Sequence, residues 1–224
     1  MPLSSFQKQL EDDLQNSVKF TINDNRSTML SVKWEPHCTK VSLHRFFLNA
    51  PENVLNALAG YIKRKDRKIA PAVKTFIEEN LNKLDYSQVV NPAKLHVQGE
   101  TYHLKQLLGD LNQEYFDNTL KLNITWFGKR VQRNRSQVTF GLYHRPLKLI
   151  KINRLLDSPK FPPYLVTYVI YHEMLHHVCP SYFDEKGKHR IHNKEFKMLE
   201  KKFRHYHEAK QWIEQNRERL FARF

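Results

Sequence analysis

The sequence has few of the residues that hold small disulfide-bonded or zinc-ribbon proteins together. It contains two cysteines in 224 residues, Cys38 and Cys179, which lie far apart and form no CxxC pair. A disulfide framework and a cysteine-based zinc ribbon are therefore excluded. No run of about 18 apolar residues occurs either, so no membrane-spanning segment and no membrane partner are expected.

The first residues, MPLSSFQKQLEDDL, lack the basic start and apolar stretch of a signal peptide. The expected compartment is therefore the cytoplasm. With 40% hydrophobic and 12% aromatic residues, the chain can bury one sizeable core, or a main domain and a smaller one. The residue pattern shows no internal repeat.

Positive charge is abundant and unevenly distributed. The formal net charge is +14. Residues 1–120 hold 15 Lys/Arg against 14 Asp/Glu, whereas residues 121–224 hold 22 against 9. Such an excess of positive charge favours polyanions or acidic protein surfaces as partners. A basic surface that only keeps the protein in solution fits the charge equally well.

Residues 1–90 are predicted to form a small α+β unit without a chemical motif. Its strands alternate in polarity and are separated by turn-forming residues, and Asn49 is expected to cap the helix that follows them. The helices are expected over residues 3–16, about 49–67 and about 70–84, and the strands over 18–24, 28–36 and 39–48.

A sharper pattern follows a junction at residues 85–94. It predicts a helix, three strands and three further helices. In the first strand, Ile124 and Trp126 should face the core and Thr125 the solvent. The helices are expected over about 102–116, 163–178, 192–203 and 205–220, and the strands over 120–127, 137–144 and 147–153, with a loop over SYFDEKGKHRI.

The helix ending at Val178 contains the stretch YHEMLHH. His172 and His176 are four residues apart, which places their β-carbons about 5–6 Å from each other on one helix face. Two imidazoles at this spacing can bind one metal ion, and Glu173, rotated round the axis, can act as general base toward a metal-bound water. Glu173 is the one Asp, Glu, Lys or Arg from Leu165 to Val178. Because an unpaired buried carboxylate is costly, a metal site explains it better than an ordinary core helix with hydrogen-bonded histidines.

A catalytic zinc ion needs a third protein ligand and an open position. His192 is a candidate because it is expected to start a helix whose apolar side contains Phe196 and Leu199. Glu195 is the alternative ligand, and His189 lies in a basic stretch that should face water. His177, on another helix face, should support the site by packing or hydrogen bonding. Cys179 should be a small buried residue.

The order of these motifs resembles that of the SprT-like metalloproteases, relatives of Spartan. The resemblance covers about residues 98–205 and is carried by LLGDLNQEYFDNTL, ITW, FGLY, LIKINRLL, YLVTYVIYHEMLHH and HNKEF. It implies an α+β fold: a zincin-like (minimal gluzincin) domain over residues 96–224, with a small three-stranded sheet and an HExxH helix, after the α+β unit of residues 1–90. It further implies one Zn²⁺ ion with His172, His176 and His192 as ligands and Glu173 as catalytic base.

The sequence departs from the family pattern at Asn193, where the family usually has glycine, which puts the backbone turn there in question. The implied reaction is hydrolysis of peptide bonds in a protein or peptide substrate extended along the strand at 137–144. Tyr143, Tyr182 and His189 are candidates for stabilising the oxyanion.

Relatives of this kind cleave proteins crosslinked to DNA, so DNA is an expected partner. Candidate phosphate ligands are Arg130, Arg133, Arg135, Lys186, Lys188 and Arg190. Two alternatives from other functional classes stay open at this point. One is a metal-dependent nuclease or nucleotide hydrolase, and the other is a non-catalytic nucleic-acid-binding module with a structural metal.

Overall fold

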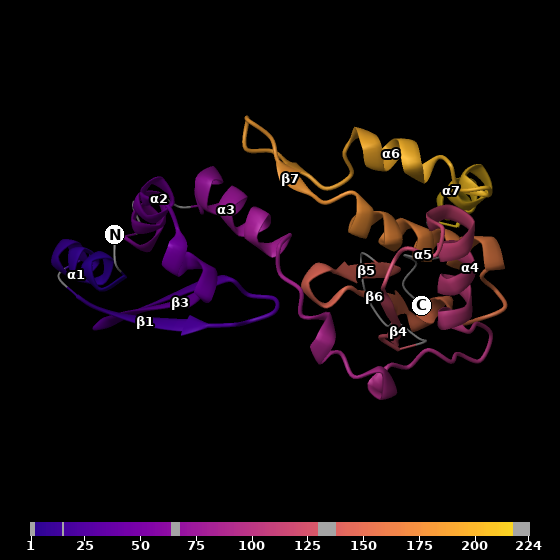
Figure 1. Cartoon of the computed structure of the whole chain (residues 1–224), viewed down its shortest axis with the longest axis horizontal. Coiled ribbons are helices and arrows are strands. Elements are labelled where there is room, and N and C mark those ends of the chain that lie inside the picture. The colour runs from indigo at the N-terminus through magenta and orange to yellow at the C-terminus, as the bar shows by residue number, and fades with distance from the viewer. Residues whose placement is uncertain (1–2, 15, 64–67, 130–137, 217–224) are drawn as a thin grey trace. The chain divides into compact units, whose positions relative to one another are not determined.

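The structure is a computed structural model of the whole chain and describes residues 3–14, 16–63, 68–129 and 138–216 (Figure 1). The chain divides into two compact units. Unit 1 comprises Met1–Leu84 and Tyr182–Arg190, and unit 2 comprises Asp85–Ser181 and Ile191–Phe224. Within the described ranges, no helix has both the length and the apolar character needed to cross a bilayer.

Unit 1 is a three-stranded sheet with helices. Its elements are α1 (Leu3–Leu14), β1 (Ser17–Asn23), β2 (Leu30–Glu35), β3 (Cys38–His44), the 3₁₀ helix η1 (Arg45–Asn49), α2 (Glu52–Ile62) and α3 (Pro71–Leu81). The strand order is β1-β3-β2, with β1 parallel and β2 antiparallel to β3. The core of the unit includes Phe6, Leu10, Leu43, Phe47 and Leu58. The predicted mixture of helices and a small sheet is confirmed.

The start of α2 differs from the prediction. Asn49 lies in η1 and does not cap α2, whose N-cap residue is Pro51. The residue before a proline is disfavoured in helical conformation, and Ala50 is accordingly extended, with φ −68° and ψ 136°. The helix therefore cannot begin before Pro51.

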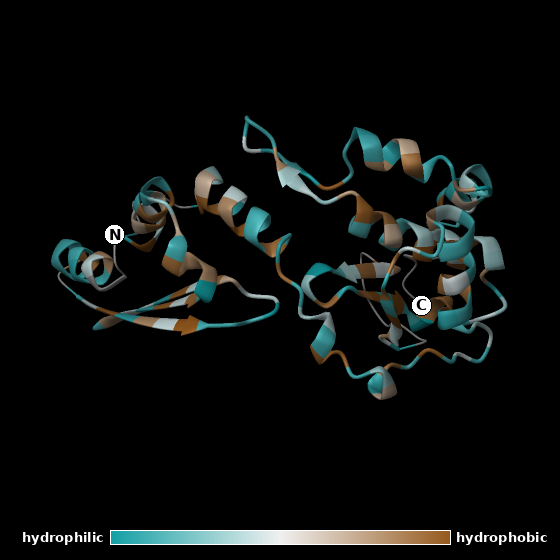
Figure 2. Ribbon diagram, viewed as in Figure 1, coloured by the Kyte–Doolittle hydropathy of each residue, from teal (hydrophilic) through white to brown (hydrophobic). Residues whose placement is uncertain are grey.

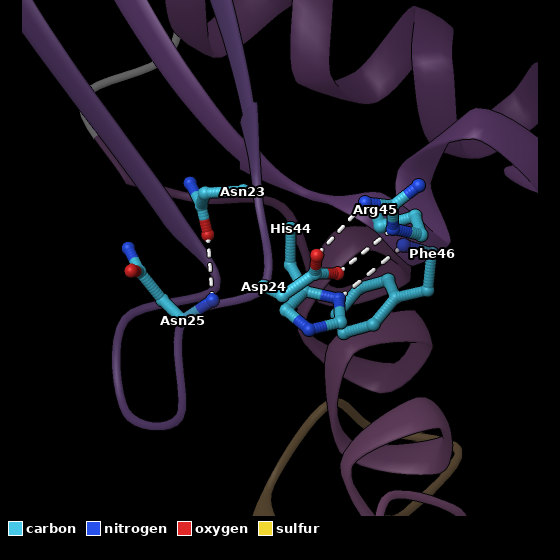
Figure 3. Close-up of polar contacts among 6 residues, drawn as sticks. All are labelled: Asn23, Asp24, Asn25, His44, Arg45 and Phe46. Carbon is cyan, nitrogen blue, oxygen red and sulfur yellow. Dashed lines mark hydrogen bonds and ion pairs between the residues drawn. The ribbon is translucent and has the colours of Figure 1, made fainter.

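The end of β3 is fixed by polar contacts (Figure 3). The Nδ1 atom of His44 accepts a hydrogen bond from the backbone N–H of Phe46 at 3.3 Å and so caps η1. The neighbouring Arg45 guanidinium donates to both carboxylate oxygens of Asp24, at 2.9 and 2.8 Å. These contacts tie the turn after β1 to the corner between the sheet and the helices.

Unit 2 has a second three-stranded sheet, covered by the helix that contains the HEMLHH stretch. Its main elements are α4 (Leu104–Phe116), β4 (Asn123–Phe127), β5 (Gly141–His144), β6 (Leu149–Asn153), the 3₁₀ helix η5 (Arg154–Leu156), α5 (Pro163–Val178), α6 (Lys194–Glu200) and α7 (Tyr206–Gln215). Helix α5 contacts β5, β6, α4, α6 and α7, which makes it the centre of this unit. Hydrophobic and hydrophilic residues alternate along the ribbons of the helices (Figure 2).

Strand β4 is more buried than predicted. Thr125 is buried together with Ile124 and Trp126, whereas alternation placed it in solvent. The segment at His96 explains the difference because it runs along β4. The Thr125 hydroxyl accepts the backbone N–H of His96 at 2.9 Å, and the N–H of Trp126 donates to the His96 carbonyl at 2.8 Å.

The two units repeat the same chain order. The order α1-β1-β2-β3-η1-α2 in unit 1 corresponds to α4-β4-β5-β6-η5-α5 in unit 2, where the 3₁₀ helix η4 (Arg145–Leu147) is inserted between β5 and β6. In both sheets the third strand is central, parallel to the first strand and antiparallel to the second. The residue pattern showed no repeat, so this duplication of topology is a finding of the structure.

The likeness extends to the residues that end the central strands. His44 ends β3 and caps η1, and Asn153 ends β6 and caps η5 in the same way, by accepting the N–H of Leu155. An arginine follows in each case, Arg45 or Arg154. The two corners are thus built alike although few of their residues are identical.

The segment predicted as a loop after α5 forms a hairpin of β7 (Tyr182–Phe183) and β8 (His189–Arg190). Gly187 at its turn has a positive φ of 69°, which glycine adopts without strain. The Phe183 and His189 rings stack with centroids 4.5 Å apart, and His189 Nε2 lies 3.6 Å from a carboxylate oxygen of Glu78 on α3. The hairpin is therefore anchored within unit 1.

Candidate metal site

Helix α5 has clear sequence signals at both ends. Pro162 is its N-cap and Pro163 its first residue, where the fixed φ of proline suits a helix and its missing N–H is not needed. The helix runs to Val178 as predicted, and Pro180 prevents its continuation. His172 and His176 are thereby held one turn apart on a rigid, largely buried element.

The three predicted ligands lie together. One ligand atom from each of His172, His176 and His192 falls within 4.8 Å of the others, the one such group of three found in the described part of the chain. The Nε2 atoms of His176 and His192 are 3.3 Å apart. Two nitrogens bound to one tetrahedral zinc ion at 2.0–2.1 Å would be separated by about 3.3 Å. The donor set therefore fits one such ion.

His192 reaches the cluster from the turn before α6 rather than from the helix itself. Asn193 is the N-cap of α6, and its side chain accepts the N–H of Phe196 at 2.8 Å. The backbone of Asn193 is extended, with φ −71° and ψ −176°, so this position does not require glycine. The buried Phe196 ring packs against all three imidazoles, with centroids 5.0, 4.8 and 4.6 Å from those of His172, His176 and His192.

Glu200 orients His172 and was not recognised from the sequence as part of the site. Its Oε1 atom lies 2.8 Å from His172 Nδ1 and accepts the hydroxyl of Tyr168 at 2.8 Å. Burial opposes ionisation of Glu200, but the hydrogen bonds from His172 and Tyr168 prevail and lower its pKa to about 2. With Nδ1 engaged, His172 presents Nε2 to the metal position. One feature of the sequence could have indicated this role. Glu200 is four residues after Phe196, which places its carboxylate on the apolar face of α6.

Glu173 is almost fully buried, with 6% of its surface exposed. Burial raises its pKa to about 7, although the charge of His172 and the backbone N–H of Tyr143 favour the ionised form. Its carboxylate packs directly on the backbone of β5, because a β-carbon added to Gly141 would meet its Oε1 atom at 2.5 Å. A base with this pKa can both accept and release a proton near neutral pH.

His176 and His192 are held in the form that binds metals. Burial above all, and then the charges of His172 and His192, lower the pKa of His176 to about 3. Burial likewise lowers the pKa of His192. Arg145, whose guanidinium donates to the His176 carbonyl, adds to the positive charge. A neutral ring keeps the lone pair that a metal ion needs.

The predicted oxyanion residues have other contacts. The Tyr143 hydroxyl is hydrogen-bonded to His177 Nδ1 at 2.7 Å, and burial raises its pKa to about 12. The hydrogen-bond partner of His177 is thus Tyr143 on β5, and support of the metal site by His177 stays a prediction. Tyr182 and His189 belong to the hairpin of unit 1, whereas the three histidines belong to unit 2. The alternative ligand Glu195 is exposed on α6, and Cys179 is buried as predicted.

The predicted phosphate ligands fall in two groups. Arg130, Arg133 and Arg135 lie outside the described residues. Lys188 is exposed on the hairpin, next to Arg190, which forms an ion pair with Asp184 at 2.7 Å. Lys186 donates its backbone N–H to the same aspartate.

Residues 104–216 match the model of the SprT-like family. The chain belongs to the SprT-like family. The match begins with α4 and extends past α7, so it includes all three histidines, Glu173 and Glu200. It also includes the β7–β8 hairpin of unit 1 and leaves the three-stranded sheet of that unit outside. The resemblance predicted from the sequence is confirmed. No curated protein and no solved structure matches the chain.

Proposed function

We propose that the SprT-like unit is a zincin-like, zinc-dependent metallopeptidase that hydrolyses peptide bonds. The observation that carries the proposal is the convergence of three imidazoles on one point beside a buried carboxylate. Family membership supports a function of the metalloprotease type. A zinc ion held there would polarise the scissile carbonyl and lower the pKa of a bound water.

The side chains of this chain have separate roles in the proposed reaction. His172, His176 and His192 would hold the ion, and Glu200 fixes the ring orientation of His172. Glu173 would take the proton from the attacking water and pass it to the leaving amine. Its burial excludes bulk water from the proton-transfer step.

The substrate is proposed to lie extended along β5. This strand is at the edge of the sheet, since β6 is its one partner among the strands that the structure describes, and Gly141 brings its backbone up to Glu173. An extended peptide can add to such an edge through backbone hydrogen bonds. An oxyanion role for Tyr143, Tyr182 or His189 stays a prediction, and Tyr143 would have to leave His177 to fulfil it.

Replacing Glu173 with glutamine tests the proposal. Degradation of casein should fall by about 10²–10⁴-fold, as expected for loss of a general base, while zinc content stays at one ion per chain. Glu195→Gln, at an exposed position of α6, is the matched control and should leave the rate unchanged. Chelator-sensitive cleavage of nucleic acid without proteolysis would instead establish the nuclease alternative, and indifference of every activity to Glu173→Gln would favour a structural metal.

Action on DNA-associated proteins stays a prediction that rests on charge. The described candidates Lys186, Lys188 and Arg190 are all exposed on the hairpin. DNA binding that depends on these cations should weaken steeply with salt. Undetectable or salt-independent binding by the purified protein would remove DNA from the proposed function.

A further inference from the structure

The metal site opens into a cavity of about 530 Å³, a size within the range of about 300–1,000 Å³ typical of ligand sites. His172, His192 and Glu173 form its catalytic side. The rest of the wall is partly apolar and partly basic. The apolar and aromatic lining comes from Phe140, Tyr168, Val169, Tyr206 and Ile213.

Three lysines line the same cavity from two helices. Lys197 and Lys201 are four residues apart at α6, so they extend from one side of that segment. Lys210 lies four residues after Tyr206 on α7 and three before Ile213, which places these three residues on one face of that helix. The cations are therefore brought to the cavity by the periodicity of both helices.

The two carboxylates of the cavity, Glu173 and Glu200, have hydrogen-bond partners other than these lysines. Glu200 is engaged by His172 and Tyr168, and Glu173 receives the backbone N–H of Tyr143. None of the three lysines has a salt bridge to another residue within the described ranges. An incoming anion would thus find three ammonium groups that form no salt bridge among the described residues, with the charge of Glu200 acting on Lys210 alone of the three.

We propose that this cavity binds an acidic side chain of the substrate, aspartate or glutamate, close to the scissile bond. The inference rests on the proposed peptidase function and specifies its substrate class. The apolar wall suits the aliphatic part of such a side chain, and lysine ammonium groups bind a carboxylate as mobile point charges. A nucleic-acid backbone fits less well, because it needs cations in a row along an open groove, whereas these three surround one cavity next to the metal ligands.

Binding can be measured without turnover in the zinc-loaded Glu173→Gln protein. Labelled peptides that differ only in one Glu, Gln or Lys should bind in that order of affinity. The Glu peptide should bind about tenfold more tightly than the Lys peptide, since each partly exposed ion pair contributes up to about fivefold. Combined Lys197→Gln, Lys201→Gln and Lys210→Gln substitutions should abolish this preference, whereas Lys194→Gln with Lys202→Gln, exposed lysines outside the cavity lining, should preserve it.

Cleavage is tested with the protein that carries no substitution, acting on a denatured protein mixture. The cleavage sites, identified by mass spectrometry, should be enriched in Asp and Glu at one position beside the cut bond. Cleavage and binding that ignore acidic residues would overturn the inference and leave the peptidase intact. A binding preference without any hydrolysis would overturn the peptidase and keep the acidic site.

Two further outcomes are decisive. Displacement of the Glu peptide by a single-stranded oligonucleotide that binds more tightly, and only when the three lysines are present, would assign the cavity to phosphate and overturn the inference. If the triple variant loses zinc or fold, the single Lys210→Gln protein replaces it. A preference for the Glu peptide that is undiminished in that variant would count against the proposal.

Discussion

A β-carbon on Gly141 would lie 2.5 Å from Oε1 of Glu173 and 2.7 Å from its Cγ, closer than such atoms approach in proteins. The absence of a side chain at Gly141 is therefore what lets the carboxylate occupy its buried position. A glycine on one strand and a glutamate on a helix thus form a single functional pair.

Gly141→Ala should accordingly displace the Glu173 carboxylate without disturbing the histidines. The expected result is a loss of peptidase rate of about 100-fold, the effect of misplacing a catalytic group by about 1 Å, with zinc content unchanged. Steady-state kinetics and metal analysis on the same preparation check this.

Gly109→Ala is the matched control. Gly109 lies within α4, and a β-carbon there meets nothing within 4 Å. Alanine should stabilise the helix by up to about 1 kcal/mol and leave the rate unaltered. Full activity of Gly141→Ala would show that the Glu173 position is not required for the reaction.

A second prediction concerns Glu200. Glu200→Gln keeps the size of the side chain but removes the negative charge facing His172 Nδ1. Zinc affinity should fall by about 10–100-fold, the usual effect of losing the hydrogen-bond partner of a metal-binding histidine. Competition with a chromogenic chelator measures this. Tyr168→Phe, which removes the other hydrogen bond to Glu200, should have a smaller effect, and an unchanged affinity in Glu200→Gln would contradict the orienting role.

The sequence predicted the parts of the site that one helix determines. The spacing of His172 and His176 follows from helical periodicity alone, and the prolines at both ends of α5 set its limits. From the sequence, the third ligand could have been His192 or Glu195. In the structure, His192 lies just before Asn193, the N-cap residue of α6, and its Nε2 atom is 3.3 Å from that of His176. Long-range contacts of this kind depend on how α6 packs, which local patterns do not encode.

Other features were out of reach for the same reason. Thr125 looked solvent-facing because alternation cannot foresee that the His96 segment covers β4. The duplicated topology was hidden because it depends on strand pairing, which is not visible in residue identities. Both findings depend on which segments lie next to each other in space, and one sequence alone does not show this.

The duplication makes a third prediction, about metal stoichiometry. Pro51 and Pro162 are the N-caps of α2 and α5, and the positions ten and eleven residues later are Tyr61 and Ile62 in one helix and His172 and Glu173 in the other. Unit 1 therefore repeats the topology without the first ligand and the base. Metal analysis should give one zinc ion per chain, and well below one for His192→Ala. A second ion that survives His192→Ala would contradict this assignment.

The last prediction concerns pH and the corner in Figure 3. His44 is buried, and burial lowers its pKa, while Asp24 raises it and Arg45 lowers it. Capping of η1 needs the neutral ring, because Nδ1 accepts the N–H of Phe46. Below the unfolded-state pKa of about 6.5, the unfolded chain binds a proton that the folded corner resists. His44 should therefore destabilise the fold progressively as the pH falls below that value.

Asn153 performs the same capping in unit 2 without a titrating ring, so His44→Asn is the informative substitution. Thermal unfolding of both proteins across pH 5–8 isolates the contribution of His44, because the other titrating groups are shared and cancel in the difference. The melting temperature of His44→Asn relative to the unchanged protein should rise as the pH is lowered through about 6.5. A difference that stays constant over this range would mean that the charge state of His44 has no part in holding the corner together.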